Sequence, residues 1–151
     1  MSALALTLVA SCNLDAAVFV APEIKEPALT VGKEALGTSL KGSLVLSLHL
    51  GARASGPSEV TVGTFSLKNA DQTVVHVENL PFTASPASPI GVAEDSDSTV
   101  EITIDTGSGL LLPAAHDAIC SGQVVVSGVI QDSLATGSTP FASTPFTPTC
   151  P

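Results

Sequence analysis

Residues 41–50 of the chain are Lys-Gly-Ser-Leu-Val-Leu-Ser-Leu-His-Leu. Leucine stands at every second position from Leu44 to Leu50, and serine, valine and histidine occupy the positions between. Side chains of a β-strand alternate between the two faces of a sheet, so a period of two places the leucines on one face. The pattern predicts a strand with one face in an apolar core and the other face toward solvent.

Other stretches repeat this pattern with variations. Residues 99–105 alternate cleanly, and residues 73–78 and 123–131 also predict strands, the last one central because it is apolar at nearly every position. Residues 59–68 change phase at Gly63-Thr64. A β-bulge at that point allows the apolar residues on both sides of it to face one core. These residues are Val60, Val62, Phe65 and Leu67.

The segments between the predicted strands are rich in turn-forming residues, and no segment shows helical periodicity. Residues 81–89 contain three prolines and are therefore excluded as a central strand. Short strands at intervals of about ten residues are typical of sandwiches and barrels. We predict an all-β fold, a single antiparallel β-sandwich of seven or eight strands, immunoglobulin-like or fibronectin-like.

The charge balance argues against nucleic-acid binding. The 151 residues carry a net charge of −9, and all five basic residues precede position 69. Binding to nucleic acid requires cationic side chains that neutralise phosphates. The chain also lacks Trp and Tyr, which makes a sugar-stacking site less favoured.

The amino-terminal segment carries a recognisable pattern. An apolar run over residues 4–9 leads into Val9-Ala10-Ser11-Cys12. This resembles the lipobox of bacterial lipoproteins, in which the cysteine receives the lipid. The run is too short to span a bilayer, which requires about 20 apolar residues, and it fits the apolar part of a signal peptide. The alternative is that the run forms a first strand.

The resemblance implies a domain plan and a location. Residues 1–12 would be a lipoprotein signal segment, residues 13–27 a tether and residues 28–151 the β-sandwich domain. Attachment to a membrane would occur only through a lipid on Cys12. Asn13 replaces the Asp associated with retention in the inner membrane, so we expect the outer membrane or surface of a bacterial cell envelope, or otherwise an extracellular location.

The other two cysteines, Cys120 and Cys150, are predicted to form a disulfide. If residues 134–137 form the tip of a hairpin, partners across it have residue numbers that sum to 270. Cys120 then lies opposite Cys150, and Val124 lies opposite Phe146. A disulfide at this position implies an oxidising compartment, whereas the alternative is two buried thiols.

No pattern in the chain predicts catalysis. His49, His76 and His116 lack the spacing of metal ligands, and no serine lies in a Gly-x-Ser-x-Gly elbow. No glycine-rich loop predicts a phosphate site. The chain is therefore predicted not to be an enzyme.

One acidic loop is a candidate calcium site. Glu94, Asp95 and Asp97 lie just before a predicted strand, and loops at the end of a sandwich often supply oxygen ligands. The alternative is a solvated acidic loop. No other cofactor is predicted.

We therefore predict a non-catalytic, exported or surface-anchored β-sandwich lipoprotein that acts as an interaction or structural module. Its partners would be other proteins or further copies of itself. One alternative is a structural subunit of an extracellular filament or particle, which would keep its apolar amino-terminal segment for packing or strand donation. The other alternative is a calcium-stabilised adhesive domain.

Overall fold

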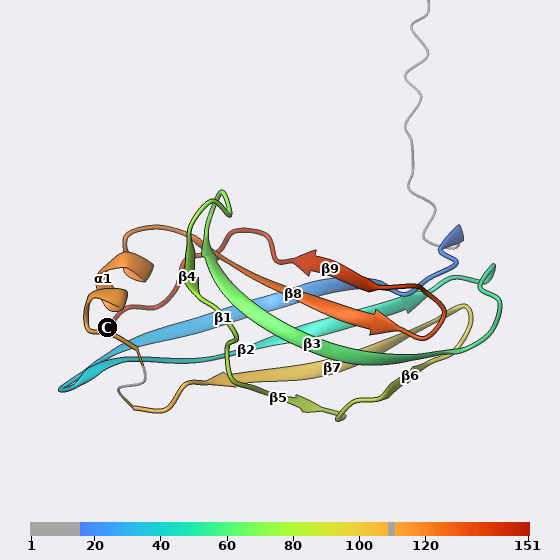
Figure 1. Cartoon of the computed structure of the whole chain (residues 1–151), viewed down its shortest axis with the longest axis horizontal. Helices are drawn as coiled ribbons and strands as arrows, with labels where there is room; N and C mark the ends of the chain where they lie inside the picture. The colour runs from blue at the N-terminus through green and yellow to red at the C-terminus, as the bar shows by residue number, and fades with distance from the viewer. Residues whose placement is uncertain (1–15, 109–110) are drawn as a thin grey trace, which may run out of the picture.

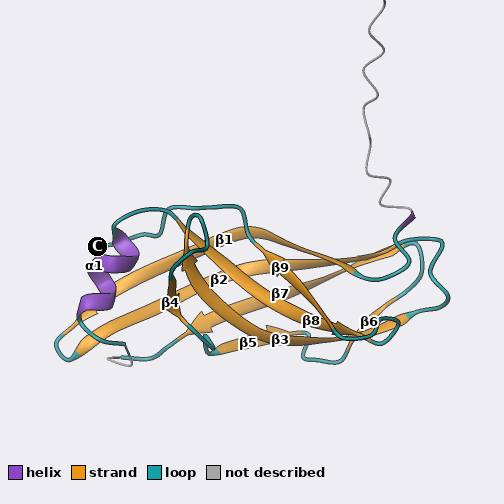
Figure 2. Ribbon diagram, turned by 45° about the horizontal axis from the view of Figure 1, so that its top comes forward, coloured by secondary structure: helices purple, strands orange, loops and turns teal. Residues whose placement is uncertain are grey.

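Two antiparallel sheets face each other in the computed structural model, which describes residues 16–108 and 111–151 (Figure 1). The first sheet has the order β1-β2-β7-β5 and the second β4-β3-β8-β9, with β6 pairing to the start of β3. One short helix, α1, lies at one end of the sandwich (Figure 2). The first sheet contains β1 (Ala21–Glu34), β2 (Gly37–Leu50), β7 (Ser96–Asp105) and β5 (Phe82–Ser85). The remaining elements are β3 (Ser58–Asn69), β4 (Val75–Val77), β6 (Ile90–Val92), α1 (Ala114–Cys120), β8 (Val124–Asp132) and β9 (Ser138–Ala142).

The predicted all-β sandwich is confirmed, and the strand order has the immunoglobulin-like arrangement. Lettered in chain order, the sheets are A-B-E-D and C′-C-F-G, with β6 as an addition. The described residues form nine strands, more than the seven or eight predicted. The excess arises because the proline-rich residues 81–89 contribute β5 at a sheet edge and lead into β6, and both strands are very short.

The core lies between the sheets, where the alternation predicted it. Leu44, Leu46, Leu48 and Leu50 of β2 are at most 2% exposed, and the inward residues of β7 are equally buried. Burying one such side chain stabilises the fold by about 1.5–3 kcal/mol. The strand predicted over residues 123–131 is β8, which is central in its sheet and buried at most positions.

The bulge predicted in β3 is present and brings aromatic side chains together. The register with β8 shifts between Val62 and Phe65. Phe65 is fully buried and meets Phe82 edge-to-face, with ring centroids 4.9 Å apart, and Phe141 at 5.8 Å. Because Phe82 belongs to β5 of the other sheet, the bulge directs the Phe65 side chain across the core.

The start of the sandwich differs from the predicted boundary at residue 28. β1 begins at Ala21, which pairs with His49 of β2, so residues 21–27 belong to the sheet rather than to a tether. The prolines in this segment suggested an extended linker. They are tolerated in a strand because β1 is the edge of its sheet and is interrupted by a bulge between Lys25 and Ala28.

The last part of the chain connects the two sheets. After β9, the edge strand that contains Pro140, the chain crosses to β1. There the Thr149 N–H donates to the Leu29 carbonyl, and the Val31 N–H donates to the Thr149 carbonyl, each at 2.8 Å. This crossing links the edges of the two sheets.

Helix α1 was not predicted from the sequence. It has seven residues, follows Pro113 and contains one buried residue, Ile119, so it offers no repeating apolar face. The proline at its start and the two alanines after it are local helix signals. Within the described residues, no helix is long and apolar enough to cross a membrane.

The β1 bulge generates a prediction for Gly42. A Cβ at Gly42 would lie 2.2 Å from the Ala28 carbonyl oxygen and 3.0 Å from the Leu29 Cα. Both are backbone atoms, so no side-chain rotation can relieve the clash. We expect Gly42→Ala to lower the free energy of unfolding by about 1–3 kcal/mol, measured by urea denaturation.

Gly91→Ala is the matched control, because a Cβ at Gly91 meets nothing within 4 Å. Apart from the intrinsic difference between Gly and Ala in a strand, it should change the free energy of unfolding by less than about 0.5 kcal/mol. Equal stability of the two variants would contradict the close approach of β1 and β2.

Candidate functional site

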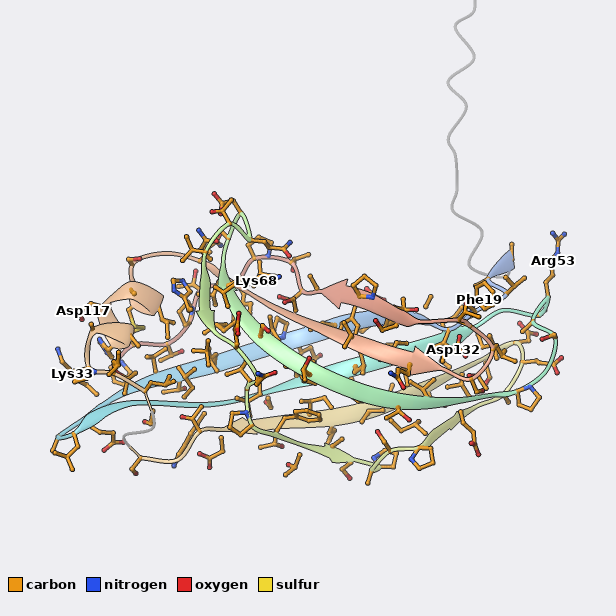
Figure 3. All side chains as sticks on the ribbon, viewed as in Figure 1. Phe19, Lys33, Arg53, Lys68, Asp117 and Asp132 are labelled. Carbon is orange, nitrogen blue, oxygen red and sulfur yellow. A yellow bond between two sulfur atoms is a disulfide. The ribbon has the colours of Figure 1, made fainter. Side chains whose placement is uncertain are left out.

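The sandwich formed by the described residues has two different ends along its long axis (Figure 3). Phe19 and Arg53 lie at one end, and Lys33 and Asp117 lie at the other. We call the first the entry end, formed by residues 16–20 and the loop of residues 51–57. The second is the disulfide end, formed by α1, Cys150 and the β1–β2 turn. The two ends are the candidate functional regions.

A buried carboxylate organises the entry end. Asp132, at the end of β8, is only 4% exposed and accepts hydrogen bonds from the Val20 N–H at 2.7 Å and the Leu134 N–H at 2.9 Å. The Ser58 hydroxyl donates a third hydrogen bond to it. The Gly51 N–H also donates to the Ala17 carbonyl at 3.0 Å. Residues from three separate parts of the chain are therefore held together where β1 begins.

Burial and hydrogen bonding act in opposite directions on the Asp132 carboxyl. Desolvation by burial raises its pKa, but the hydrogen bonds from Ser58, Val20 and Leu134 together lower the pKa to below the usual aspartate value. The group is ionised at neutral pH and has three donors for its oxygens. It acts as a structural clasp, which we call the Asp132 clasp.

The lipobox-like residues, including Cys12, lie outside the described residues. The Asp132 clasp nevertheless fixes the place where the chain enters the fold, because Val20 is only eight residues beyond Cys12. A connection of eight residues spans at most about 28 Å. Any group attached to Cys12 therefore stays within that distance of Val20.

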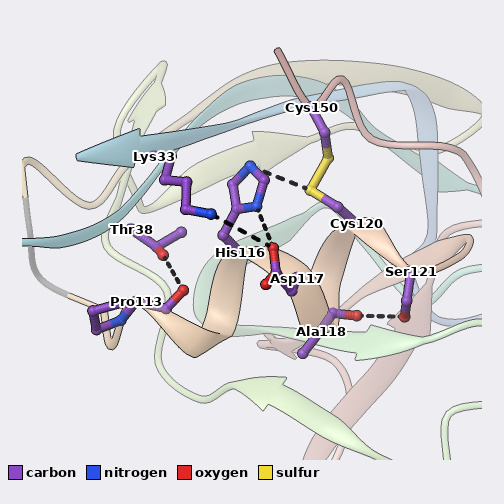
Figure 4. Close-up of a disulfide and its surroundings, with 9 residues drawn as sticks. All are labelled: Lys33, Thr38, Pro113, His116, Asp117, Ala118, Cys120, Ser121 and Cys150. Atoms are coloured by element: carbon purple, nitrogen blue, oxygen red, sulfur yellow. Dashed lines mark hydrogen bonds and ion pairs between the residues drawn. A yellow bond between two sulfur atoms is a disulfide. The ribbon is translucent and has the colours of Figure 1, made fainter. Parts of the chain in front are cut away.

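The disulfide end is built around α1, and Figure 4 shows its side chains. The predicted Cys120–Cys150 disulfide is present and ties the last residue of α1 to the segment after β9. Ile119 is fully buried and holds the helix on the core. At the start of α1, the Thr38 hydroxyl of β2 donates to the carbonyls of Leu112 at 3.0 Å and Pro113 at 3.4 Å.

A histidine lies against the disulfide. His116 Nε2 is 3.9 Å from Cys120 Sγ, and His116 Nδ1 is 3.0 Å from Asp117 Oδ1. Lys33 Nζ of β1 lies 4.0 Å from the same Asp117 oxygen. The hydrogen bond with His116 and, second, the positive charge of Lys33 lower the pKa of Asp117.

The geometry predicted for the disulfide is corrected in detail. Cys120 lies at the end of α1 rather than in the hairpin ladder. Val124 pairs with Phe146 as predicted, but the β8–β9 ladder itself runs one residue out of the predicted register and pairs Ser127 with Ala142. The segment between Ala142 and Phe146 contains Pro145 and leaves the ladder, which absorbs the difference of one residue.

The structure separates the acidic residues that were proposed for calcium. Glu94 and Asp95 lie in the turn between β6 and β7, whereas Asp97 lies within β7 with its Oδ1 2.7 Å from His49 Nδ1. Within residues 16–108 and 111–151, no group of three or more His, Cys, Asp or Glu is placed to hold a metal ion. The calcium site remains a sequence-based prediction.

Two open surface hollows accompany these ends. One, of about 470 Å³, lies between the β3–β4 turn and the end of α1, and the half-exposed Val74 and His76 line it. Another, of about 630 Å³, lies on the outer face of β1, β2 and β7, beside His49 and Asp97. Both hollows are lined by apolar and polar side chains.

Comparisons with known proteins give a weak likeness in fold. No family model and no curated protein matches the chain. Among solved structures, the ASH / PapD-like domain of human CEP192 (PapD-like domain 7) is similar over 95% of this chain and 93% of its own, with 15% identity and a TM-score of 0.36. The CooA pilin subunit from enterotoxigenic Escherichia coli is similar over 86% of this chain and 98% of its own, with 12% identity and a TM-score of 0.35. At these values neither structure assigns a family or a function to this chain.

The Asp132 clasp generates a prediction for stability and its pH dependence. The folded-state pKa of Asp132 lies below the unfolded value, so its contribution is present above about pH 4 and is lost as the pH falls through the folded value. Asp132→Asn replaces an acceptor oxygen with an NH₂ group that faces N–H and O–H donors. We expect it to lower the free energy of unfolding by about 1–3 kcal/mol at pH 7, and by less at pH 3, in urea denaturation.

Asp95→Asn is the control, because Asp95 is exposed and its φ of 51° is one that Asn tolerates. It should remain within about 0.5 kcal/mol of the parent protein at both pH values. A deficit for Asp132→Asn that is the same at pH 3 as at pH 7 would show that the ionised carboxylate is not what the clasp uses.

Proposed function

We propose that the chain is an exported lipoprotein, anchored through Cys12 to a bacterial cell envelope, whose sandwich is a non-catalytic interaction or structural module. The lipobox-like Val9-Ala10-Ser11-Cys12 supports the anchor. The immunoglobulin-like sandwich supports a module that presents surfaces and loops to partners.

The observation that carries the proposal is the Cys120–Cys150 disulfide. Disulfides persist in oxidising compartments and are rare in the cytosol of ordinary cells. A chain that relies on this bond is expected to be exported, and the lipobox-like segment supplies a route for export and a point of attachment.

The two ends of the molecule indicate how the anchored protein would be oriented on the membrane. With a lipid on Cys12, the short connection to Val20 would keep the entry end close to the membrane, within about 28 Å. The disulfide end lies at the other end of the sandwich and would then face outward (Figure 3). The turn that joins β1 to β2 also lies at the disulfide end, and its Leu36 is 88% exposed. Leu112, just before α1, is 78% exposed.

The engagement of polar groups supports binding rather than catalysis. Asp132 is occupied by three hydrogen bonds from the protein itself, and Asp71 is held within its own turn by Thr73. These contacts fix loops and chain entry. Because these two carboxylates have structural roles, we assign partner contact to the outer surfaces of the sheets and to the disulfide end.

A structural subunit of an extracellular filament or particle is the second candidate. Its supporting observation is the edge strand β4, whose first residue Val75 and the preceding Val74 are 44% and 51% exposed beside a short ladder. An edge with exposed apolar residues can accept a strand from another chain. In that case residues 1–12 would remain in the mature protein and take part in assembly.

The anchor is tested with Cys12→Ser in a bacterial host. We expect the parent protein to be found in the membrane fraction and to incorporate labelled palmitate, because a lipid chain supplies the membrane affinity. Cys12→Ser should lose both the label and the membrane association.

Ser11→Ala is the matched control, because it keeps a small residue before the cysteine and should behave as the parent does. A parent protein that is unlabelled and released in full length, with residues 1–12 retained, would overturn the anchor and favour the subunit. Size-exclusion chromatography would then show assemblies in place of a monomer.

A further inference from the structure

The two cysteines of the Cys120–Cys150 disulfide have unequal surroundings. Residue Cys150 is exposed, whereas residue Cys120 is half-buried at the end of α1 and its Sγ contacts His116. Thiol–disulfide exchange begins with a thiolate that attacks one sulfur and expels the other. Access favours attack on Cys150, and Cys120 is then the leaving group.

The imidazole of His116 is placed to assist that leaving group. Its Nδ1 faces the Asp117 carboxylate at 3.0 Å, and its Nε2 faces Cys120 Sγ at 3.9 Å (Figure 4). Both of these partners are acceptors, so a ring with protons on both nitrogens donates to both at once. Asp117, itself beside Lys33 of β1, orients the ring through its contact with Nδ1.

The position of Cys120 favours such assistance. Cys120 is the last residue of α1, and the carbonyl groups at the end of a helix disfavour an anion. A nearby positive charge or proton donor offsets this effect for a thiolate that leaves at this position. His116, one turn earlier on the same helix face, supplies it.

We propose that this disulfide is a directional exchange site, at which an external thiolate forms a mixed disulfide with Cys150 and His116 assists the departure of Cys120. The attacking thiolate forms an S–S bond to Cys150 Sγ, and the Cys120–Cys150 bond breaks with its electron pair remaining on Cys120 Sγ. The Nε2 proton of His116 stabilises or neutralises that sulfur. The external thiol is the reductant, and the products are the mixed disulfide and a free Cys120.

The structure also provides for the reverse step. Thr149, next to Cys150, remains hydrogen-bonded to Leu29 and Val31 of β1 through backbone groups that the exchange does not touch. The two cysteines therefore stay close after opening, and Cys120 can attack the mixed disulfide intramolecularly. This inference depends on the disulfide and its neighbours and is independent of the lipid anchor.

The direction of exchange is tested on the oxidised full chain with reduced glutathione. The reaction is quenched with acid, free thiols are alkylated, and the modified cysteines are mapped by peptide mass spectrometry. We expect glutathione on Cys150 and the alkyl group on Cys120. Glutathione on Cys120, or an equal distribution between the two cysteines, would overturn the proposal.

The role of His116 is tested by the rate of the same reaction. His116→Gln keeps a polar side chain but cannot carry the proton, and we expect exchange to slow by about tenfold or more. Asp117→Asn, which leaves the imidazole in place, should slow it less. His76→Gln removes an imidazole from the neighbouring hollow without a sulfur contact and should leave the rate unchanged.

Thermal unfolding of each oxidised variant shows whether the fold is intact before rates are compared. A folded His116→Gln protein that exchanges at the parent rate would refute the role of His116. The mapping of the parent protein needs no variant, so the direction of attack is tested even if a variant fails to fold.

Discussion

The packing of Phe65 between the two sheets is the contact on which the sandwich depends. The Phe65 side chain projects from β3 into the core and is fully buried. Its ring contacts Phe82 of the opposite sheet and Phe141 of the edge strand β9. It faces inward because the β3 bulge resets the alternation of side chains. Gly63 makes the bulge sterically feasible, since a Cβ there would lie 2.7 Å from the Val129 side chain, and Gly128 leaves room for the Phe65 ring. The apolar faces of both sheets can then share one core.

The sandwich positions two unlike ends. At the entry end, the Asp132 clasp draws the first described residues onto the loops after β2 and β8. At the disulfide end, Cys120 and Cys150 hold the helix before β8 to the segment after β9. Each end thus fixes one extremity of the described chain onto a strand connection. A lipid anchor on Cys12 would hold the entry end near the membrane and leave the disulfide end free for contact with partners, as the proposed function requires.

Local alternation made most of the fold predictable, and long-range contacts account for what was missed. The strands β2, β7 and β8 and the β3 bulge follow from side chains two residues apart. Residues 21–27 were assigned to a tether because their prolines are tolerated only at a sheet edge, and sheet position is not encoded locally. Asp132 was overlooked as a clasp because Val20 and Ser58 lie 112 and 74 residues away in the sequence. The spacing of His116 and Cys120 acquires meaning only when both lie on a helix, and α1 is too short to show a period.

The intact mass of the protein purified from bacterial membranes, recorded before and after reduction, tests the anchor and the disulfide together. We expect a chain that begins at an acylated Cys12 and gains two hydrogen atoms when the Cys120–Cys150 disulfide is reduced. An unmodified chain that still carries residues 1–12 would contradict the anchor, and a mass that does not change on reduction would contradict the disulfide and with it the argument for export.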